Sequence, residues 1–207
     1  MTNQAKSKNY TPLILATLAW FCLWSLVPAL MSRSIGSWLF ADSTVAMLVD
    51  IAIAALVLTV LFLTHQKFNR TLFKAQKTRW LYLLPVVALL AIPLRVGGID
   101  GDIFGNPAWL YVLMMTASVA MQQYLTFGLL QSYLGKKLPM PLTIMLTTLV
   151  FYLGHALFIA DKFAPIYPLN ALFIVVLGVI FASIRAKSGT LHANIALHLG
   201  FYFVLIG

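Results

Sequence analysis

Residues 45–64 read VAMLVDIAIAALVLTVLFLT, an apolar run in which Asp50 is the only charged side chain. A helix needs about 20 predominantly apolar residues to cross the hydrocarbon core of a bilayer. This stretch therefore predicts a transmembrane helix. Similar apolar stretches elsewhere in the chain give further candidates at residues 10–32, 80–97, 107–134, 140–160, 166–184 and 188–206.

The composition indicates the same class of protein. Of the 207 residues, 61% are hydrophobic and 9% are charged, whereas an ordinary soluble domain carries about 25% charged residues. These values exclude a soluble globular domain, and a disordered chain would be polar and poor in aromatic residues. A transmembrane barrel would show short alternating segments in place of long apolar runs. We therefore expect an all-α polytopic membrane bundle of about seven helices, forming a single transmembrane domain over residues 1–207.

The 14 lysine and arginine residues are distributed unevenly over the loops. With a cytoplasmic N-terminus, the cytoplasmic side holds eleven of them: Lys6, Lys8, Lys67, Arg70, Lys74, Lys77, Arg79, Lys136, Lys137, Arg185 and Lys187. Only Arg33, Arg95 and Lys162 are left outside. Because cytoplasmic loops carry an excess of lysine and arginine, we expect a multi-pass protein of the cell membrane with its N-terminus inside and its C-terminus outside. The net charge of +9 is then explained by the lysine and arginine residues of the cytoplasmic loops. We therefore expect membrane lipids as partners, and we do not expect nucleic acid.

Four polar side chains lie midway through the apolar stretches: Gln122 and Gln123 in residues 107–134, His155 in residues 140–160, and His198 in residues 188–206. Polar groups at membrane depth are costly, usually face the bundle interior and often mark a site. They can also join helices by hydrogen bonds in a purely structural role. Because the four share a similar depth, we expect His155 to face Gln122 or Gln123, with His198 close by.

The sequence does not indicate a metal site. Cys22 is the single cysteine, which excludes a cysteine-based zinc site and an internal disulfide. His192 and His198 are six residues apart and point to different faces of a helix. We expect neither a metal nor any other cofactor.

Three short motifs follow one another in the second half of the chain: Gln122-Gln123-Tyr124-Leu125-Thr126-Phe127-Gly128, Phe151-Tyr152-Leu153-Gly154-His155 and His198-Leu199-Gly200-Phe201-Tyr202. In order and spacing, residues 107–207 resemble the CPBP family of intramembrane glutamic endopeptidases. This family, also called Abi, includes CAAX proteases and bacteriocin-processing enzymes. Its pattern is Glu-Glu-x-x-x-Arg, Phe-x-x-x-His and His-x-x-x-Asn on successive helices. The resemblance implies a CAAX-protease-like helical core in the second half.

The resemblance also assigns roles to these positions. In the family, the first glutamate activates water with help from the histidine of the second motif, and the histidine and asparagine of the third motif stabilise the oxyanion. The matching positions here are Gln122, Gln123, Phe127, His155, His198 and Tyr202. A glutamine amide cannot accept a proton, and the chain contains no glutamate. The resemblance therefore implies a degenerate member without a general base.

The paired nature of the losses favours natural degeneration over an engineered inactive form. Positions 123 and 127 are four residues apart, so the family's glutamate and arginine face each other on one helical face. Here Gln123 and Phe127 remove both charges together. A lone buried charge would be the costly state.

Several functions remain open. The first is a non-catalytic protein that binds another membrane protein or a peptide. The second is an active or engineered-inactive intramembrane endopeptidase, and the third is a small-molecule-binding subunit of a membrane transporter. A helical scaffold joined by polar contacts is the fourth. A close approach of Gln122, Gln123, His155 and His198 would favour the protease-like bundle over the transporter subunit.

Overall fold

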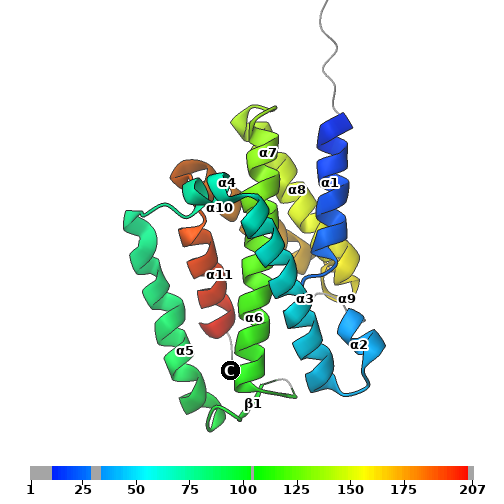
Figure 1. Ribbon diagram of the computed structural model, residues 1–207, viewed down its shortest axis with the longest axis vertical. Helices are drawn as coiled ribbons and strands as arrows, with labels where there is room; N and C mark the ends of the chain where they lie inside the picture. The colour runs from blue at the N-terminus through cyan, green and yellow to red at the C-terminus, as the bar shows by residue number, and fades with distance from the viewer. Residues whose placement is uncertain (1–10, 29–33, 104, 205–207) are drawn as a thin grey trace, which may run out of the picture.

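The computed structural model describes residues 11–28, 34–103 and 105–204, and nearly all of them are helical (Figure 1). The elements are α1 (Thr11–Trp24), α2 (Ile35–Leu39), α3 (Ser43–Thr64), α4 (Gln66–Leu72), the 3₁₀ helix η1 (Lys77–Tyr82), α5 (Leu83–Val96), β1 (Asp102–Ile103), β2 (Asn106–Pro107), α6 (Ala108–Gln122), the π-helix η2 (Gln123–Leu130), α7 (Gln131–Gly135), α8 (Met140–Phe158), α9 (Ala160–Phe163), α10 (Pro168–Ser188) and α11 (His192–Val204). The two strands form one antiparallel hairpin in which Asp102 pairs with Pro107. The expected all-α class is confirmed.

Helices of membrane-spanning length and hydropathy are present in the part of the chain that the structure describes. Four such helices occupy Ser43–Thr64, Lys77–Val96, Met140–Phe158 and Pro168–Ser188. The helices α1 and α11 are shorter, and the stretch expected at residues 107–134 is divided among α6, η2 and α7. The chain is a membrane protein, and the number of about seven spans stays a prediction.

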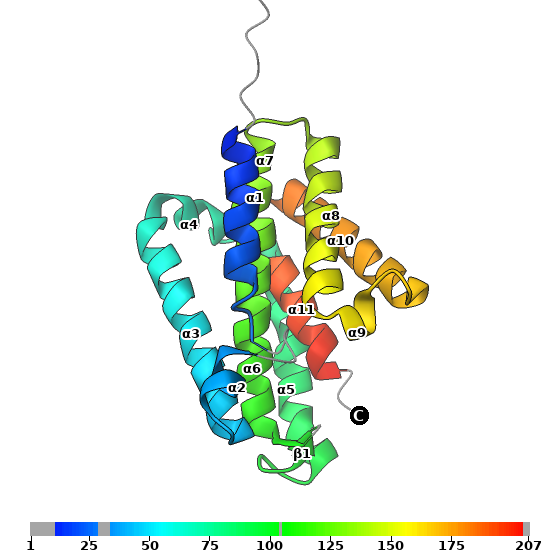
Figure 2. The ribbon, with the colours of Figure 1, turned by 90° about the vertical axis from the view of Figure 1, so that its right-hand side faces the viewer.

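A continuous rod made of α6, η2 and α7 runs through the middle of the molecule (Figures 1 and 2). The helix α3 packs against α6, and α1 packs against η2. The helix α10 packs along α8, while α11 packs along α5 and also contacts α6. The rod therefore brings the first and last helices of the chain to one central element.

Local sequence signals set several helix ends. The Asp42 side chain accepts a hydrogen bond of 2.9 Å from the Val45 N–H at the start of α3, as an N-cap carboxylate does. The helix α10 begins at Pro168, where the missing N–H is tolerated. It ends at Ser188 and is capped by Gly189, whose φ of 71° is left-handed, a conformation that favours glycine at a helix C-terminus.

The first helix is shorter than the expected span of residues 10–32. It ends at Trp24, and turns follow it as far as Pro28. Proline lacks an N–H, and its ring clashes with the carbonyl four residues earlier, which here belongs to Trp24. Residues 29–32 of that expected span lie outside the described residues.

A short helix that the apolar pattern did not predict, α2, packs closely on α3. The Asp50 side chain accepts a 2.8 Å hydrogen bond from the Gly36 N–H. A Cβ at position 36 would lie 1.9 Å from the Ala46 carbonyl oxygen, so only glycine allows this approach. Asp50, the only charged side chain of residues 45–64, is buried in this contact.

Basic and acidic residues separate toward opposite ends of the bundle. The elements α4, η1 and the C-terminal ends of α7 and α10 lie together at one end (Figure 1), and they carry or adjoin Lys67, Arg70, Lys74, Lys77, Arg79, Lys136, Lys137, Arg185 and Lys187. The turn before α3 and the β hairpin region lie toward the other end and carry Asp42, Asp100 and Asp102, with Arg95 at the end of α5 as a basic residue on that side.

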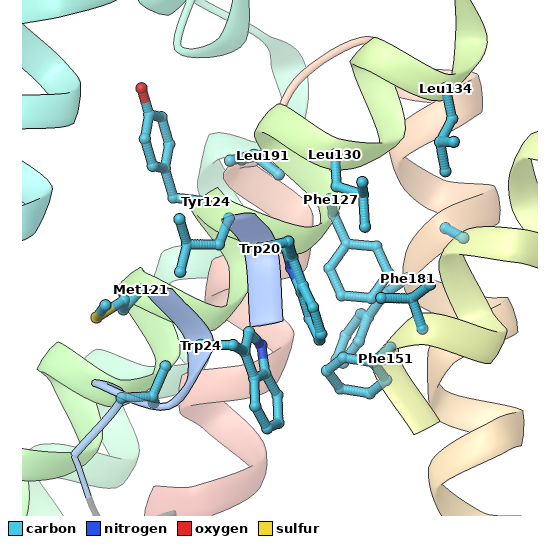
Figure 3. Packing of buried hydrophobic residues seen from close by; sticks show 14 of the residues in the cluster. Trp20, Trp24, Met121, Tyr124, Phe127, Leu130, Leu134, Phe151, Phe181 and Leu191 are labelled. Carbon is cyan, nitrogen blue, oxygen red and sulfur yellow. The ribbon is translucent and has the colours of Figure 1, made fainter. Parts of the chain in front are cut away.

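The largest buried cluster lies where α1 meets the second half of the chain. Trp20 and Trp24 of α1 lie beside Phe127 and Phe151, which come from η2 and α8 (Figure 3). A Cβ at Gly154 would lie 2.9 Å from ring carbons of both tryptophans. Glycine at this position therefore lets the two tryptophans of α1 pack against α8. These tryptophans border the polar site described next.

Candidate functional site

Gln122 and Gln123 lie where the central rod changes from α-helix to π-helix. Gln122 is the last residue of α6 and Gln123 is the first of η2. Both side chains are fully buried, with 0% of their surface exposed. Stretches of π-helix inside α-helices occur frequently at functional sites. The change in helix type thus coincides with the first sequence motif.

Gln123 joins the rod to α11 through two hydrogen bonds. Its Nε2 lies 2.8 Å from His198 Nδ1, and its Oε1 accepts a 3.2 Å bond from Asn194 Nδ2. Asn194 Nδ2 also donates to the Phe181 carbonyl on α10 at 3.0 Å. One polar network therefore links α10, α11 and the rod.

The Phe181 carbonyl at the end of this network sets the donor and acceptor of every hydrogen bond in it. The Phe181 carbonyl can only accept, so Asn194 must present its NH₂ group. That NH₂ faces Gln123, which must present its oxygen to Asn194 and its own NH₂ to His198. An amide NH₂ only donates, so His198 Nδ1 accepts. His198 is then a neutral imidazole with its proton on Nε2.

Gln122 makes a separate contact and leaves one atom unpaired. Its Nε2 donates to the Ser118 hydroxyl at 3.0 Å, one turn earlier on α6. Its Oε1 is buried without a hydrogen-bond partner among the described residues, as is the Oδ1 atom of Asn194. Leaving a buried acceptor unpaired typically costs about 1–3 kcal/mol, so these two oxygens are available to an added donor.

His155 lies in an aromatic surrounding. Its ring centroid is 5.0 Å from that of Trp24, 4.5 Å from Phe151 and 5.4 Å from Phe163. Its Nδ1 donates to the Phe151 carbonyl at 2.9 Å, since that carbonyl can only accept. In the neutral ring, Nε2 is then an acceptor.

The sequence predicted that His155 faces Gln122 or Gln123, whereas the glutamine–histidine hydrogen bond in the structure is made by His198. Within the described ranges, the hydrogen bond of Gln123 to a histidine goes to His198, and His155 has none to either glutamine. A chain of ring contacts links the two histidines: Phe151 contacts both His155 and Phe127, and Phe181 contacts both Phe127 and His198. The structure thus brings Gln123 and His198 together directly and leaves His155 on the aromatic side of the same region.

Phe127 occupies the position of the family's arginine and is completely buried. Its ring centroid lies 5.2 Å from that of Phe151 and 5.6 Å from that of Phe181. These contacts place an apolar ring where the motif would place a charge. Tyr202, at the position of the family's asparagine, stacks on His198 with centroids 5.2 Å apart and planes 26° apart.

Asn194 is a site residue that the sequence reasoning missed. It is fully buried and lies four residues before His198 on α11, so both side chains share one helical face. An asparagine one turn before a membrane-depth histidine was the available signal. Thr126 was also missed, and its hydroxyl accepts a 3.1 Å hydrogen bond from the Trp20 indole N–H.

The site as a whole offers neutral donors and acceptors. Within the described part of the chain, no group of three histidine, cysteine or acidic side chains is placed to hold a metal ion. The polar groups around Gln123 are amides and imidazoles, and the only carboxyl-bearing residues of the chain are its five aspartates. Chemically, this arrangement can bind polar groups by hydrogen bonds but supplies no carboxylate base.

We predict that Asn194 fixes the tautomer of His198. Replacing Asn194 by leucine keeps the size and removes both hydrogen bonds, so the Gln123 amide can turn over and either ring nitrogen of His198 can carry the proton. Nitrogen-15 NMR of histidine-labelled protein should show Nε2 protonation of His198 in the wild type and a mixture of tautomers in Asn194→Leu. Ser118→Ala, which removes only the partner of Gln122, should leave the His198 signals unchanged. A single Nε2–H tautomer in Asn194→Leu would contradict this assignment.

The family model for Rce1-like type II CAAX prenyl endopeptidases matches residues 104–204. No curated protein and no solved structure matches the chain. The matched region contains the three motifs, the network around Gln123 and His155.

Proposed function

We propose that this chain, whose residues 104–204 belong to the CPBP/CAAX protease family as an Rce1-like domain, is a non-catalytic member that binds another membrane protein or a peptide. The observation that carries the proposal is the identity of residues 122 and 123. Both glutamate positions of the first motif hold glutamine, and the chain has no glutamate elsewhere. Without a carboxylate there, the site lacks the group that would take a proton from water.

The surroundings of the two glutamines support the same proposal. A general base must lie within hydrogen-bonding reach of the proton that it removes, and the groups bonded to Gln123 are Asn194 and His198. His198 Nδ1 is already occupied as an acceptor. Phe127 packs against Phe151 and Phe181, so an aromatic ring fills the position at which the family has arginine.

A binding role is supported by the unpaired oxygens of the site. Gln122 Oε1 and Asn194 Oδ1 are acceptors without partners among the described residues. The backbone N–H groups of a peptide are donors that need acceptors at membrane depth. A donor group that reaches these oxygens would therefore gain hydrogen bonds from both the rod and α11.

The proposal is tested by measuring turnover and binding on the same substrates. A fluorogenic peptide library is incubated with the full chain in liposomes, and both cleavage and retention are recorded. The proposal expects retention of a subset of peptides without cleavage above background. Cleavage by the wild-type chain that is lost in His155→Ala would overturn the non-catalytic function, and the absence of retention would overturn the binding role.

We also propose a multi-pass topology with the N-terminus in the cytoplasm. The clustering of basic side chains at the end formed by α4, η1 and the C-terminus of α10 supports it (Figure 1), since lysine and arginine favour the cytoplasmic side. The aspartates near the hairpin then lie outside.

Cysteine labelling checks this orientation. In a Cys22→Ser background, Ala75→Cys and Asp100→Cys introduce thiols at two exposed positions near opposite ends of α5. A membrane-impermeant maleimide added to intact cells should label position 100 and not position 75, and permeabilised cells should label both. Labelling of position 75 in intact cells would reverse the topology.

A further inference from the structure

A groove of about 410 Å³ lies at the basic end of the bundle. One wall is α1 with Trp20, another is the end of α3 and the start of α4 with Phe68, and the floor is formed by Leu125 and Leu129 of the rod. Figure 2 shows α1 beside the upper part of the rod, with α3 and α4 on its other side. The volume lies within the range of about 300–1,000 Å³ that is typical of ligand pockets.

The groove exists because α1 presents small side chains to it. Ala16 and Ala19 line it, whereas Leu15 and Leu18 of the same helix do not and are 60% and 56% exposed. Two alanines one turn apart leave space that leucines would fill. The floor and walls are almost wholly apolar, so the space suits a hydrocarbon chain.

Polar and basic groups are confined to one end of the groove. His65, Ser132 and Lys136 line it there, at the end of α3 and the end of α7. Lys67, Arg70 and Lys137 are exposed nearby in the sequence. The aspartates of the chain lie on other elements, in or beside the α2–α3 region, the β hairpin and α9. The mouth of the groove is therefore positively charged without a neighbouring carboxylate.

We propose that the groove binds one acyl chain of an anionic phospholipid, with the phosphate of its headgroup held by Lys136. The apolar floor takes the chain, and the basic end takes the charge, as lysine side chains do at anionic membrane surfaces. The mouth lies at the end of the candidate span Ser43–Thr64, where such a helix would leave the hydrocarbon core. The proposal is independent of the polar site around Gln123.

Tryptophan fluorescence tests it, because Trp20 lines the groove. The full chain is reconstituted in phosphatidylcholine vesicles that contain equal small fractions of brominated phosphatidylglycerol or brominated phosphatidylcholine. The anionic lipid should quench more strongly at equal fraction, and the excess should disappear in Trp20→Phe. Lys136→Ala should weaken the preference for the anionic lipid by about fivefold, from about 1 kcal/mol per basic residue near the surface. Lys74→Ala, an equal charge change at the same end away from the groove, should leave it nearly unchanged.

A second pair of variants tests occupation of the groove itself. Ala19→Phe fills the space and should abolish the excess quenching, whereas Leu15→Phe, on the outer face of α1, should preserve it. Equal quenching by the two lipids would overturn the proposal. Equal effects of Lys136→Ala and Lys74→Ala, or undiminished quenching in Ala19→Phe, would do so as well.

Discussion

Phe127→Arg is expected to destabilise the folded chain by about 3–5 kcal/mol, because it places an unpaired charge in a buried apolar site. Phe127 is fully buried and packs on Phe151 and Phe181. Gln123, four residues earlier on the rod, offers no negative charge. For a chain of 150–250 residues, each kcal/mol shifts the Tm by about 2–4 °C, so the expected decrease is roughly 6–20 °C.

The measurement is thermal unfolding of the purified protein in detergent. Phe127→Leu is the matched control, since it changes the packing without adding charge and should cost about 1 kcal/mol. Adding Gln123→Glu to Phe127→Arg should restore part of the loss, because a carboxylate one turn away can pair with the guanidinium. The double-mutant cycle should give a coupling of about 0.5–3 kcal/mol. An arginine variant as stable as the leucine variant would show that the aromatic cluster does not exclude charge.

The wild-type chain should hydrolyse no peptide bond above background, and only a combined set of substitutions should change this. General-base catalysis typically contributes about 10²–10⁴-fold to a rate, and neither glutamine can supply it. Gln122→Glu with Gln123→Glu should remain inactive, since two like charges in a low-dielectric site do not both ionise. Phe127→Arg is needed to stabilise one of them, and Tyr202→Asn restores the amide donor of the oxyanion site.

Turnover of a fluorogenic peptide library in liposomes provides the measurement. The quadruple variant should exceed the wild type by about 10²-fold or more, and His155→Ala in that background should remove the gain. The double glutamate variant serves as the control for added negative charge alone. Equal rates in the double and quadruple variants, both above background, would show that the arginine position is not required.

The helical class and the approximate positions of most helices could be predicted from the sequence. Residues 45–64 correspond to α3 (Ser43–Thr64), and residues 140–160 correspond to α8 (Met140–Phe158). These predictions succeed because the length of an apolar run is a local property and every backbone polar group in hydrocarbon must be paired within its own helix. The first span was predicted too long, as residues 10–32, because the apolar run continues past Pro28, whereas α1 ends at Trp24.

The sequence alone placed Gln122, Gln123, His155 and His198 at similar depth, and it identified the missing glutamates. Only the tertiary structure decided which of them meet. Gln123 bonds to His198 and Asn194, while His155 lies among Trp24, Phe151 and Phe163. Depth depends on counting residues along one helix. Contact depends on how each helix is rotated about its axis, and that rotation is set by packing between distant segments, as where Gly154 admits the tryptophans of α1.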